Sequence, residues 1–252
     1  MFRGVLQVAV AIAVVAIGGV CKALASSETK EFMAKELVRL ELTNQGGRIR
    51  IIGEATDKII VKVDKVNFGE KCLLSFKQTD KVLEIEGGKR SMLSNVDCEA
   101  NFSLVIPKKM KIQLKNLKGP VDIAGTKGEL EIKVGAGDVK VQSIVDHLNA
   151  IAGKGSFDIQ GMVGSANIKL GSGDIKLGYS KDPGKGEVDI KTGSGDATLF
   201  LPAKMRVHSR VLVGSGDAFN ELGDFEDAKF FVSFKAGSGN LNIKASSHRS
   251  IE

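Results

Sequence analysis

Short runs of alternating apolar and polar residues fill most of the chain between residues 37 and 245. Leu130, Ile132 and Val134, for example, alternate with Glu131 and Lys133. A repeat of two residues is the period of a β-strand with one buried face, not of a helix. The pattern therefore predicts an all-β protein.

A glycine-rich motif, Gly-X-Gly-Asp or a close variant, separates many of these runs. It starts at positions 135, 153, 171, 193, 214 and 237, so it recurs every 18 to 23 residues. Glycine adopts positive φ angles that other residues avoid, so the motif is typical of tight turns. We predict structural turns at Gly135, Gly137, Asp138, Gly153, Gly155, Gly171, Gly173, Asp174, Gly193, Gly195, Asp196, Gly214, Gly216, Asp217, Gly237, Gly239 and Asn240.

Recurrence at a nearly fixed period is typical of a stacked repeat array. Each repeat should contain a strand, the Gly-X-Gly-Asp turn, a second strand and a second turn of variable length. We predict a parallel β-solenoid, like a β-helix or β-roll, in which Gly171, Gly193 and Gly214 form one column on successive coils about 4.8 Å apart. A chain of antiparallel hairpins is the alternative. The expected core contains Ile132, Val134, Ile168, Leu170, Ile190, Leu199, Phe230, Val232 and Phe234.

The chain before residue 119 contains strand-like runs but no copy of the motif. The runs lie at 37–42, 49–52, 58–66, 72–77, 82–86, 102–106 and 111–117. We expect this part to be an irregular β cap that protects the first coil from edge pairing. The predicted organisation is a signal peptide at 1–25, the N-terminal β region at 26–118, the solenoid repeats at 119–245 and a polar tail at 246–252.

The first 25 residues have the pattern of a secretory signal peptide. Arg3 precedes a mostly apolar run from Val5 to Val20, and Ala23-Leu24-Ala25 is a suitable cleavage sequence. The run is shorter than the roughly 18 apolar residues of a membrane-spanning helix; an uncleaved anchor stays the alternative. A lipoprotein site at Cys21 is disfavoured because Val20 is not small. We therefore expect an exported protein, in the periplasm or on the cell surface.

Cleavage after Ala25 would leave two cysteines, Cys72 and Cys98. An even number of cysteines in an exported protein permits a disulfide. We expect this pair to be bridged; two buried thiols are the alternative, since the separation of the two Cα atoms decides the matter.

The chain carries a formal net charge of +6, and five lysines gather without an acid between residues 108 and 118. One interpretation is a patch for anionic lipid headgroups or acidic glycans. The other is an ordinary solvated strand face, because alternation alone explains most of these lysines. The candidate anion-binding residues are Lys108, Lys109, Lys111, Lys115 and Lys118.

The exported leader, the strand from Phe102 to Lys108 and the Gly-Asp-rich strand repeats that follow it resemble the bacterial putative-adhesin family of β-strand repeat proteins. That family is a domain of unknown function, and the resemblance covers about residues 37 to 245. It implies an envelope-associated β-solenoid. It transfers no catalytic or binding residue to this chain.

The aspartates of the motif should stack in one column, which makes a calcium-binding β-roll one interpretation. Calcium takes six or more oxygen ligands, however, and the column is interrupted by Ser156 and Asn240. We favour a local role, in which each side chain bonds to the backbone of its own turn. No metal or other cofactor is expected.

A carbohydrate-active β-helix enzyme is the main catalytic alternative. Such an enzyme needs two carboxyl groups beside a sugar groove, whereas acids here are matched with lysines in the same strand. Tyr179 is the one tyrosine of a chain without tryptophan, so sugar-stacking platforms are scarce, and His147, His208 and His248 lack zinc-ligand spacing.

Nucleic-acid binding is not expected of an exported chain without interleaved aromatic residues. The sequence thus predicts a non-enzymatic solenoid of the cell envelope that is structural or binds as an adhesin does. Its partner stays open among an envelope glycan, an anionic lipid and a protein surface.

Overall fold

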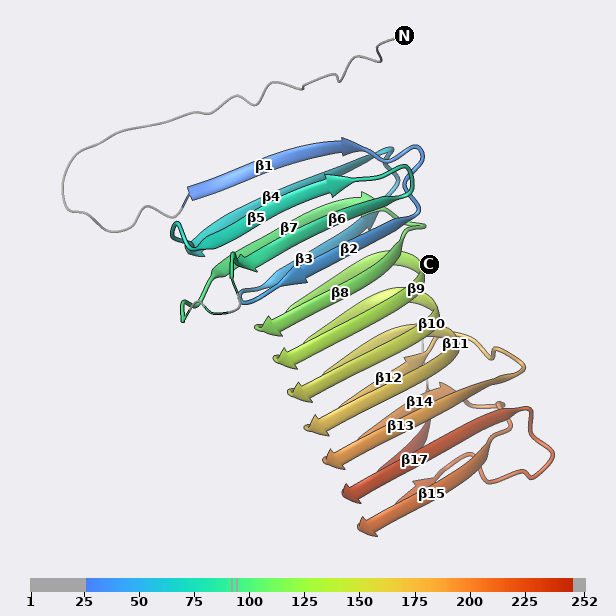
Figure 1. The fold of residues 1–252 in the computed structure, drawn as a ribbon. Helices are drawn as coiled ribbons and strands as arrows, with labels where there is room; N and C mark the ends of the chain where they lie inside the picture. The colour runs from blue at the N-terminus through green and yellow to red at the C-terminus, as the bar shows by residue number, and fades with distance from the viewer. Residues whose placement is uncertain (1–25, 92, 94, 247–252) are drawn as a thin grey trace.

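A computed structural model of the chain describes residues 26–91, 93 and 95–246. Figure 1 shows its strands stacked into one elongated body. None of the described residues belongs to a helix long and apolar enough to cross a membrane. The predicted signal peptide, with Cys21, lies outside the described residues, as does the tail beyond Ser246.

Two rows of strands run along the stack. In spatial order, row A contains β5 (Cys72–Gln78), β6 (Val82–Lys89), β2 (Arg39–Asn44), β8 (Lys111–Lys118), the second halves of β9 (Val121–Ala136), β10 (Val139–Lys154) and β11 (Phe157–Ser172), then β13 (Gly186–Ser194), β17 (Phe230–Ser238) and β15 (His208–Ser215). Row B contains β1 (Ser26–Met33), β4 (Lys58–Asn67), β7 (Glu99–Pro107), β3 (Ile49–Glu54), the first halves of β9, β10 and β11, then β12 (Ile175–Tyr179), β14 (Ala197–Pro202), β18 (Leu241–Ser246) and β16 (Ala218–Asn220).

Most neighbouring strands in both rows pair in parallel, which confirms the parallel β-solenoid and excludes a chain of hairpins. Antiparallel pairing is confined to the N-terminal end, where β1 pairs with β4, β4 with β7, and β5 with β6. These strands lie at one end of the stack. The boundary expected between the N-terminal β region and the repeats, at residues 118 and 119, does not interrupt the parallel rows, since β8 pairs with both β2 and β9.

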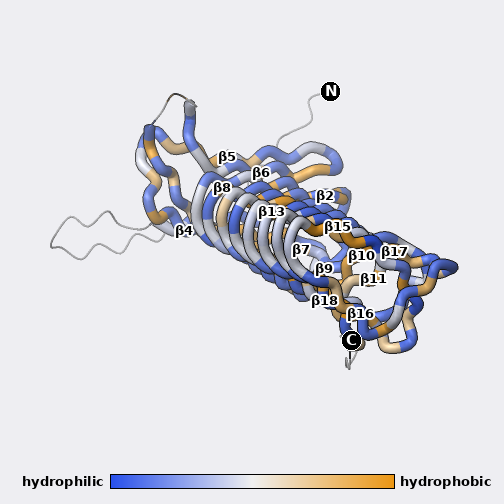
Figure 2. Tube along the Cα trace, turned by 90° about the horizontal axis from the view of Figure 1, so that it is seen from below, coloured by the Kyte–Doolittle hydropathy of each residue, from blue (hydrophilic) through white to orange (hydrophobic). Residues whose placement is uncertain are grey.

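The core lies between the two rows, and Figure 2 shows the successive coils of the backbone that enclose it. Every second side chain of a strand points inward and stacks on the same position of the next coil. One such column contains Leu114, Ile132, Ala150, Ile168 and Ile190. Each fully buried leucine or isoleucine contributes about 1.5–3 kcal/mol. All nine core residues expected from the alternation are buried.

The second turn expected in every repeat is missing from the coils of β10 and β11, so that prediction was wrong there. The chain rounds this corner inside one continuous strand of 16 residues. The pairing register of β10 with β11 shifts between Gln142 and Val145, and again before His147. A β-bulge bends a strand by inserting an extra residue, so no separate turn is needed.

The order of coils along the chain differs from their order in space at the C-terminal end. β13 pairs with β17, and β15 pairs with the other side of β17. The column of glycines exists, but Gly237, not Gly214, lies beside Gly193. The expected succession was wrong because the last coil of the chain fills a gap between two earlier ones.

The N-terminal end shows the same exchange. The coil of β2 and β3 lies between the coil of β6 and β7 and that of β8 and β9. The first and last coils of the chain are therefore hydrogen-bonded on both sides. Terminal segments fray unless they are tied down in this way.

Paired cysteines test this order. Ser194 and Ser238 lie in register on adjacent strands, about 4.8 Å apart, which suits the Cα separation of a disulfide. We expect Ser194→Cys with Ser238→Cys to form a crosslink that mass spectrometry of unreduced peptides detects. Ser194→Cys with Ser215→Cys should stay reduced, because two strand spacings, roughly 10 Å, separate them. A crosslink in the second pair alone would contradict the exchanged order.

Candidate functional site

The Gly-X-Gly-Asp turns stack along one edge of the solenoid, and their two glycines have different roles. The second glycine has a positive φ in every copy, for example +129° at Gly173, and a Cβ there would collide with the carbonyl oxygen of Gly155. The first glycine lacks a positive φ. At Gly193, however, a Cβ would lie 2.5 Å from the carbonyl oxygen of Gly171. The close backbone approach of adjacent coils therefore requires both glycines.

The side chain at the fourth position of the motif connects adjacent coils. Oδ1 of Asp138 accepts hydrogen bonds from the backbone N–H and the hydroxyl of Ser156, each at 2.8 Å. Oδ1 of Asp174 accepts from the N–H of Asp196 at 3.0 Å, and Oδ1 of Asp196 accepts from the N–H of Asn240 at 2.8 Å. The expected bond to the residue's own turn was wrong, because these acceptors serve the N–H of the next coil.

The turn column does not have the ligands of a calcium site. Each coil supplies one side chain at this position, and Oδ1 of Asp138, Asp174, Asp196 and Asn240 accepts a backbone hydrogen bond. Calcium requires six or more oxygens. In the described part of the chain, no three His, Cys, Asp or Glu side chains are grouped as metal ligands.

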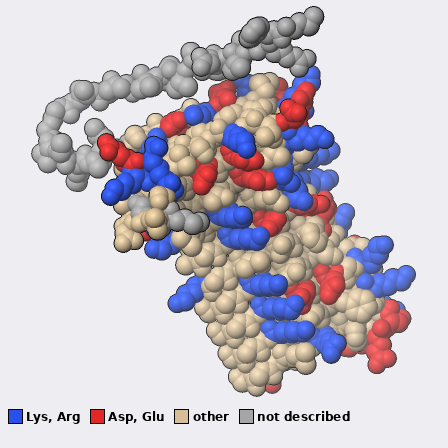
Figure 3. Space-filling view, in the orientation of Figure 1, with Lys and Arg blue, Asp and Glu red and all other residues tan. Residues whose placement is uncertain are grey.

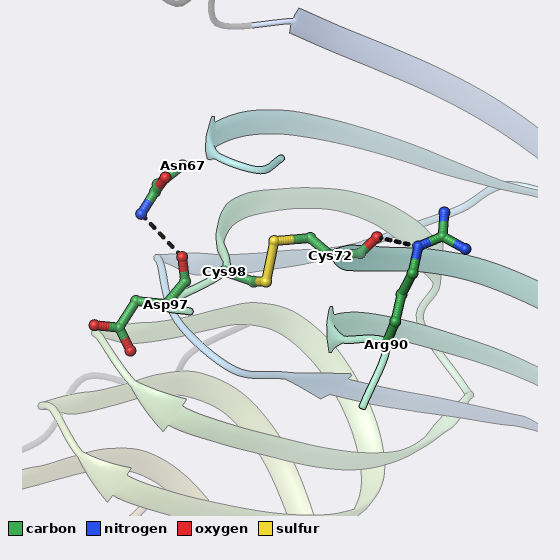
Figure 4. Close-up of a disulfide and its surroundings, with 5 residues drawn as sticks. All are labelled: Asn67, Cys72, Arg90, Asp97 and Cys98. Atoms are coloured by element: carbon green, nitrogen blue, oxygen red, sulfur yellow. Dashed lines mark hydrogen bonds between the residues drawn. A yellow bond between two sulfur atoms is a disulfide. The ribbon is translucent and has the colours of Figure 1, made fainter. Parts of the chain in front are cut away.

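Cys72 and Cys98 are joined by a disulfide, with a Cα–Cα distance of 5.7 Å (Figure 4). The bridge links the start of β5 to the residue before β7. Asn67 Nδ2 donates to the carbonyl oxygen of Asp97 at 2.9 Å, and Arg90 Nε donates to that of Cys72 at 3.0 Å. The two cysteines are 26 residues apart, and closing such a loop removes roughly 3 kcal/mol of freedom from the unfolded chain. The bridge thereby holds the long loop that replaces a glycine turn in the coil of β6 and β7.

A cavity of about 460 Å³ opens on the turn edge beside this disulfide. Arg48 and Lys118 line it together with Asp97 and Glu99. Arg48 is also paired with Asp122 at 2.9 Å. The mixed charges favour no single class of ligand.

The five lysines of the candidate patch lie in different places. Lys108 and Lys109 occupy the turn between β7 and β8, and Lys118 ends β8. Lys111 points outward on β8 and pairs with Glu129 at 2.5 Å. Lys115 also points outward, but it lies in register with Lys133 of β9.

Lys115 thus begins a line of basic residues along row A, which we call the lysine column. Its members occupy the same outward position on β8, β9, β11, β13 and β17, and Ile151 takes this position on β10. Figure 3 shows basic side chains following one another down this face. The column comprises Lys115, Lys133, Lys169, Lys191 and Lys235. An alignment of the repeat sequences could have identified the first four members. The place of Lys235 could not be found in this way, because it depends on the insertion of β17 between β13 and β15.

Replacing Asp174 tests the connection between coils. Asp174→Asn should change the stability little, because an amide oxygen can accept the same bond, as Asn240 Oδ1 does from the N–H of Asp217 at 2.9 Å. Asp174→Ala should lower the free energy of unfolding by about 1 kcal/mol, the net worth of one hydrogen bond. Chemical denaturation measures both. Equal losses in the two variants would contradict the assignment, and so would a saturable rise in the wild-type melting temperature on adding calcium.

The acid stability of the protein should depend on Asp138. Hydrogen bonds from the hydroxyl and the backbone N–H of Ser156 hold the pKa of Asp138 below its ordinary value of 3.8. A lowered pKa in the folded state stabilises the protein above the ordinary value, and this contribution disappears as the pH falls through the folded-state pKa. Asp138→Asn does not titrate, so it should lose less stability than wild type between pH 5 and pH 2, roughly. Parallel pH profiles of denaturation would contradict this.

Solved structures with a similar arrangement of strands come from several bacteria. A putative cell adhesion protein from Clostridium sporogenes is 18% identical, with 88% of this chain and 100% of that chain covered and a TM-score of 0.47. A putative adhesin from Bacteroides fragilis is 10% identical, with coverages of 87% and 97% and a TM-score of 0.42. A putative lipid binding protein from Parabacteroides distasonis is 14% identical, with coverages of 86% and 97% and a TM-score of 0.44.

No curated protein matches the chain significantly. The model of one protein family, described as Toastrack DUF4097, matches residues 111–248. The match spans more than half of the chain and contains every Gly-X-Gly-Asp turn and the whole lysine column. The chain therefore belongs to the Toastrack DUF4097 family.

Proposed function

We propose that this protein is an exported binding module of the cell envelope and not an enzyme. The observation that carries the proposal is the construction of row A, in which the same outward position recurs on successive coils. A rigid face of this kind presents one chemical group repeatedly along a line. Such a surface suits an extended partner better than a compact small molecule, which needs a concave pocket.

The charges of the outward acids support binding over acid–base catalysis. Glu129 and Glu131 accept hydrogen bonds from Lys111 and Lys133, and these bonds hold the pKa of each carboxyl below its ordinary value. Partial burial opposes the ionisation of Asp189, but hydrogen bonds from Lys191 and Ser233 outweigh it and lower the pKa of this carboxyl too. A glycosidase needs a carboxyl whose pKa is raised, so that it can donate a proton.

The place of Tyr179 also disfavours a carbohydrate-active enzyme. Its ring is buried, packs edge-on against Phe230 and donates from its hydroxyl to the carbonyl oxygen of Gly164 at 2.6 Å. The one tyrosine of the chain is therefore a core residue and no platform for a sugar ring.

Export is supported by two independent features. The first 25 residues have the pattern of a signal peptide. The Cys72–Cys98 disulfide is a bond that forms and persists in oxidising compartments outside the cytoplasm.

Fractionating native cells with antibody detection tests the proposal. We expect the protein in the periplasmic or surface fraction with Ser26 as its first residue, and we expect the purified protein to sediment with isolated envelopes. A cytoplasmic protein that retains residues 1–25, or one that does not sediment with envelopes, would refute it.

A further inference from the structure

Three lysines of the lysine column stand on adjacent coils without interruption. Lys169 on β11 is in register with Lys191 on β13, which is in register with Lys235 on β17. All three side chains are exposed. Adjacent members are one strand spacing apart, about 4.8 Å.

Stacking like charges in this way costs stability, because equal charges directly opposite each other in a sheet repel. The solenoid does not require it, as row B shows. There, an outward column on β3, β9, β10, β11 and β12 alternates in sign through Arg50, Asp122, Lys140, Asp158 and Lys176. The same fold therefore carries a column of alternating charges on one face and a column of one sign on the other.

Partners within row A neutralise only part of the lysine column. Lys133 pairs with Glu131 and Lys191 with Asp189, each at 2.7 Å. The residues two positions before Lys169 and Lys235 are Asn167 and Ser233, which carry no charge. Among the ion pairs of the described residues, neither lysine takes part in one.

The surroundings of these lysines restrict the shape of an anionic partner. Asp189 lies beside the lysine column, two residues before Lys191 on β13. On the other side of the column, the strands end in the glycine turns, and Asp174 and Asp196 follow these turns. The turn position between the lysines and these aspartates is serine at Ser172 and Ser194. A flat anionic surface would meet the aspartates beyond the edge as well as the lysines. A thread along the column would avoid those aspartates and would pass one acid, Asp189 beside Lys191.

We propose that the lysine column binds a linear polyanion that runs parallel to the solenoid axis, specifically an acidic glycan with one negative charge per sugar ring. The spacing of the coils, about 4.8 Å, is close to the length of one sugar ring in an extended chain, so the charges of such a chain recur at a period that matches the column. This inference rests on the proposed function and names the class of partner.

The test compares two double variants that remove the same charge from opposite faces. Lys169→Gln with Lys235→Gln removes two of the three column lysines that take part in no ion pair among the described residues. Lys140→Gln with Lys176→Gln is the control on row B. The probes are polygalacturonate oligosaccharides, neutral dextran and phosphatidylglycerol vesicles. Titration calorimetry and co-sedimentation measure binding at low and high salt.

We expect wild type to bind polygalacturonate in a salt-sensitive manner, and to bind dextran and the vesicles far more weakly. Lys169→Gln with Lys235→Gln should weaken the binding about tenfold or more without lowering the melting temperature, because it also removes repulsion. The control should bind almost as wild type does, and its melting temperature should fall because it breaks the alternating column.

Three outcomes would overturn the inference. Equal weakening by both variants would show a response to net charge alone, and tighter binding to the vesicles would indicate a membrane surface. Binding to none of the probes would exclude this glycan chemistry. Sedimentation with native envelopes is measured separately, so the proposed function can survive each of these outcomes.

Discussion

The structure depends on in-register stacking of parallel backbones at one strand spacing. Every feature on one coil must fit directly over the same feature on the next, along both rows. At the turn edge this leaves no room for a Cβ, so glycine recurs there. In the core it produces columns of aliphatic side chains, and on the outer faces it brings each charge next to its counterpart on the adjacent coil.

This constraint gives the outer faces their properties. A column that alternates in sign stabilises the stack, and a column of one sign repels itself. The protein has both kinds, on opposite rows. At the turn edge, the aspartates connect adjacent coils by accepting a hydrogen bond from the backbone N–H of the next coil. The ends are protected differently: antiparallel strands and a disulfide cover one end, and at both ends the terminal coil of the chain lies inside the stack.

The sequence predicts the repeating part of the fold well because the repeat is local. Alternation in residues such as Leu130 to Val134 identifies strands and their buried faces, and the glycine motif identifies one edge. The sequence does not show which coils are neighbours. Gly193 lies beside Gly237 because the coil of β17 and β18, the last in the chain, is inserted between the coil of β13 and β14 and that of β15 and β16. Similarly, the acceptor role of Asp174 depends on a backbone N–H 22 residues away. The strand Ser26–Met33 was missed because its alternation includes few large apolar residues.

Native-state hydrogen exchange on the purified protein tests this account most directly, because it reports the local stability of each coil. The stacking order requires the amides of β17 and β18 to be protected about as well as those of β13 and β14. Those of β15 and β16, which end the stack, should exchange faster although they precede β17 in the chain. Protection that declines steadily in chain order from β13 to β18 would contradict the account.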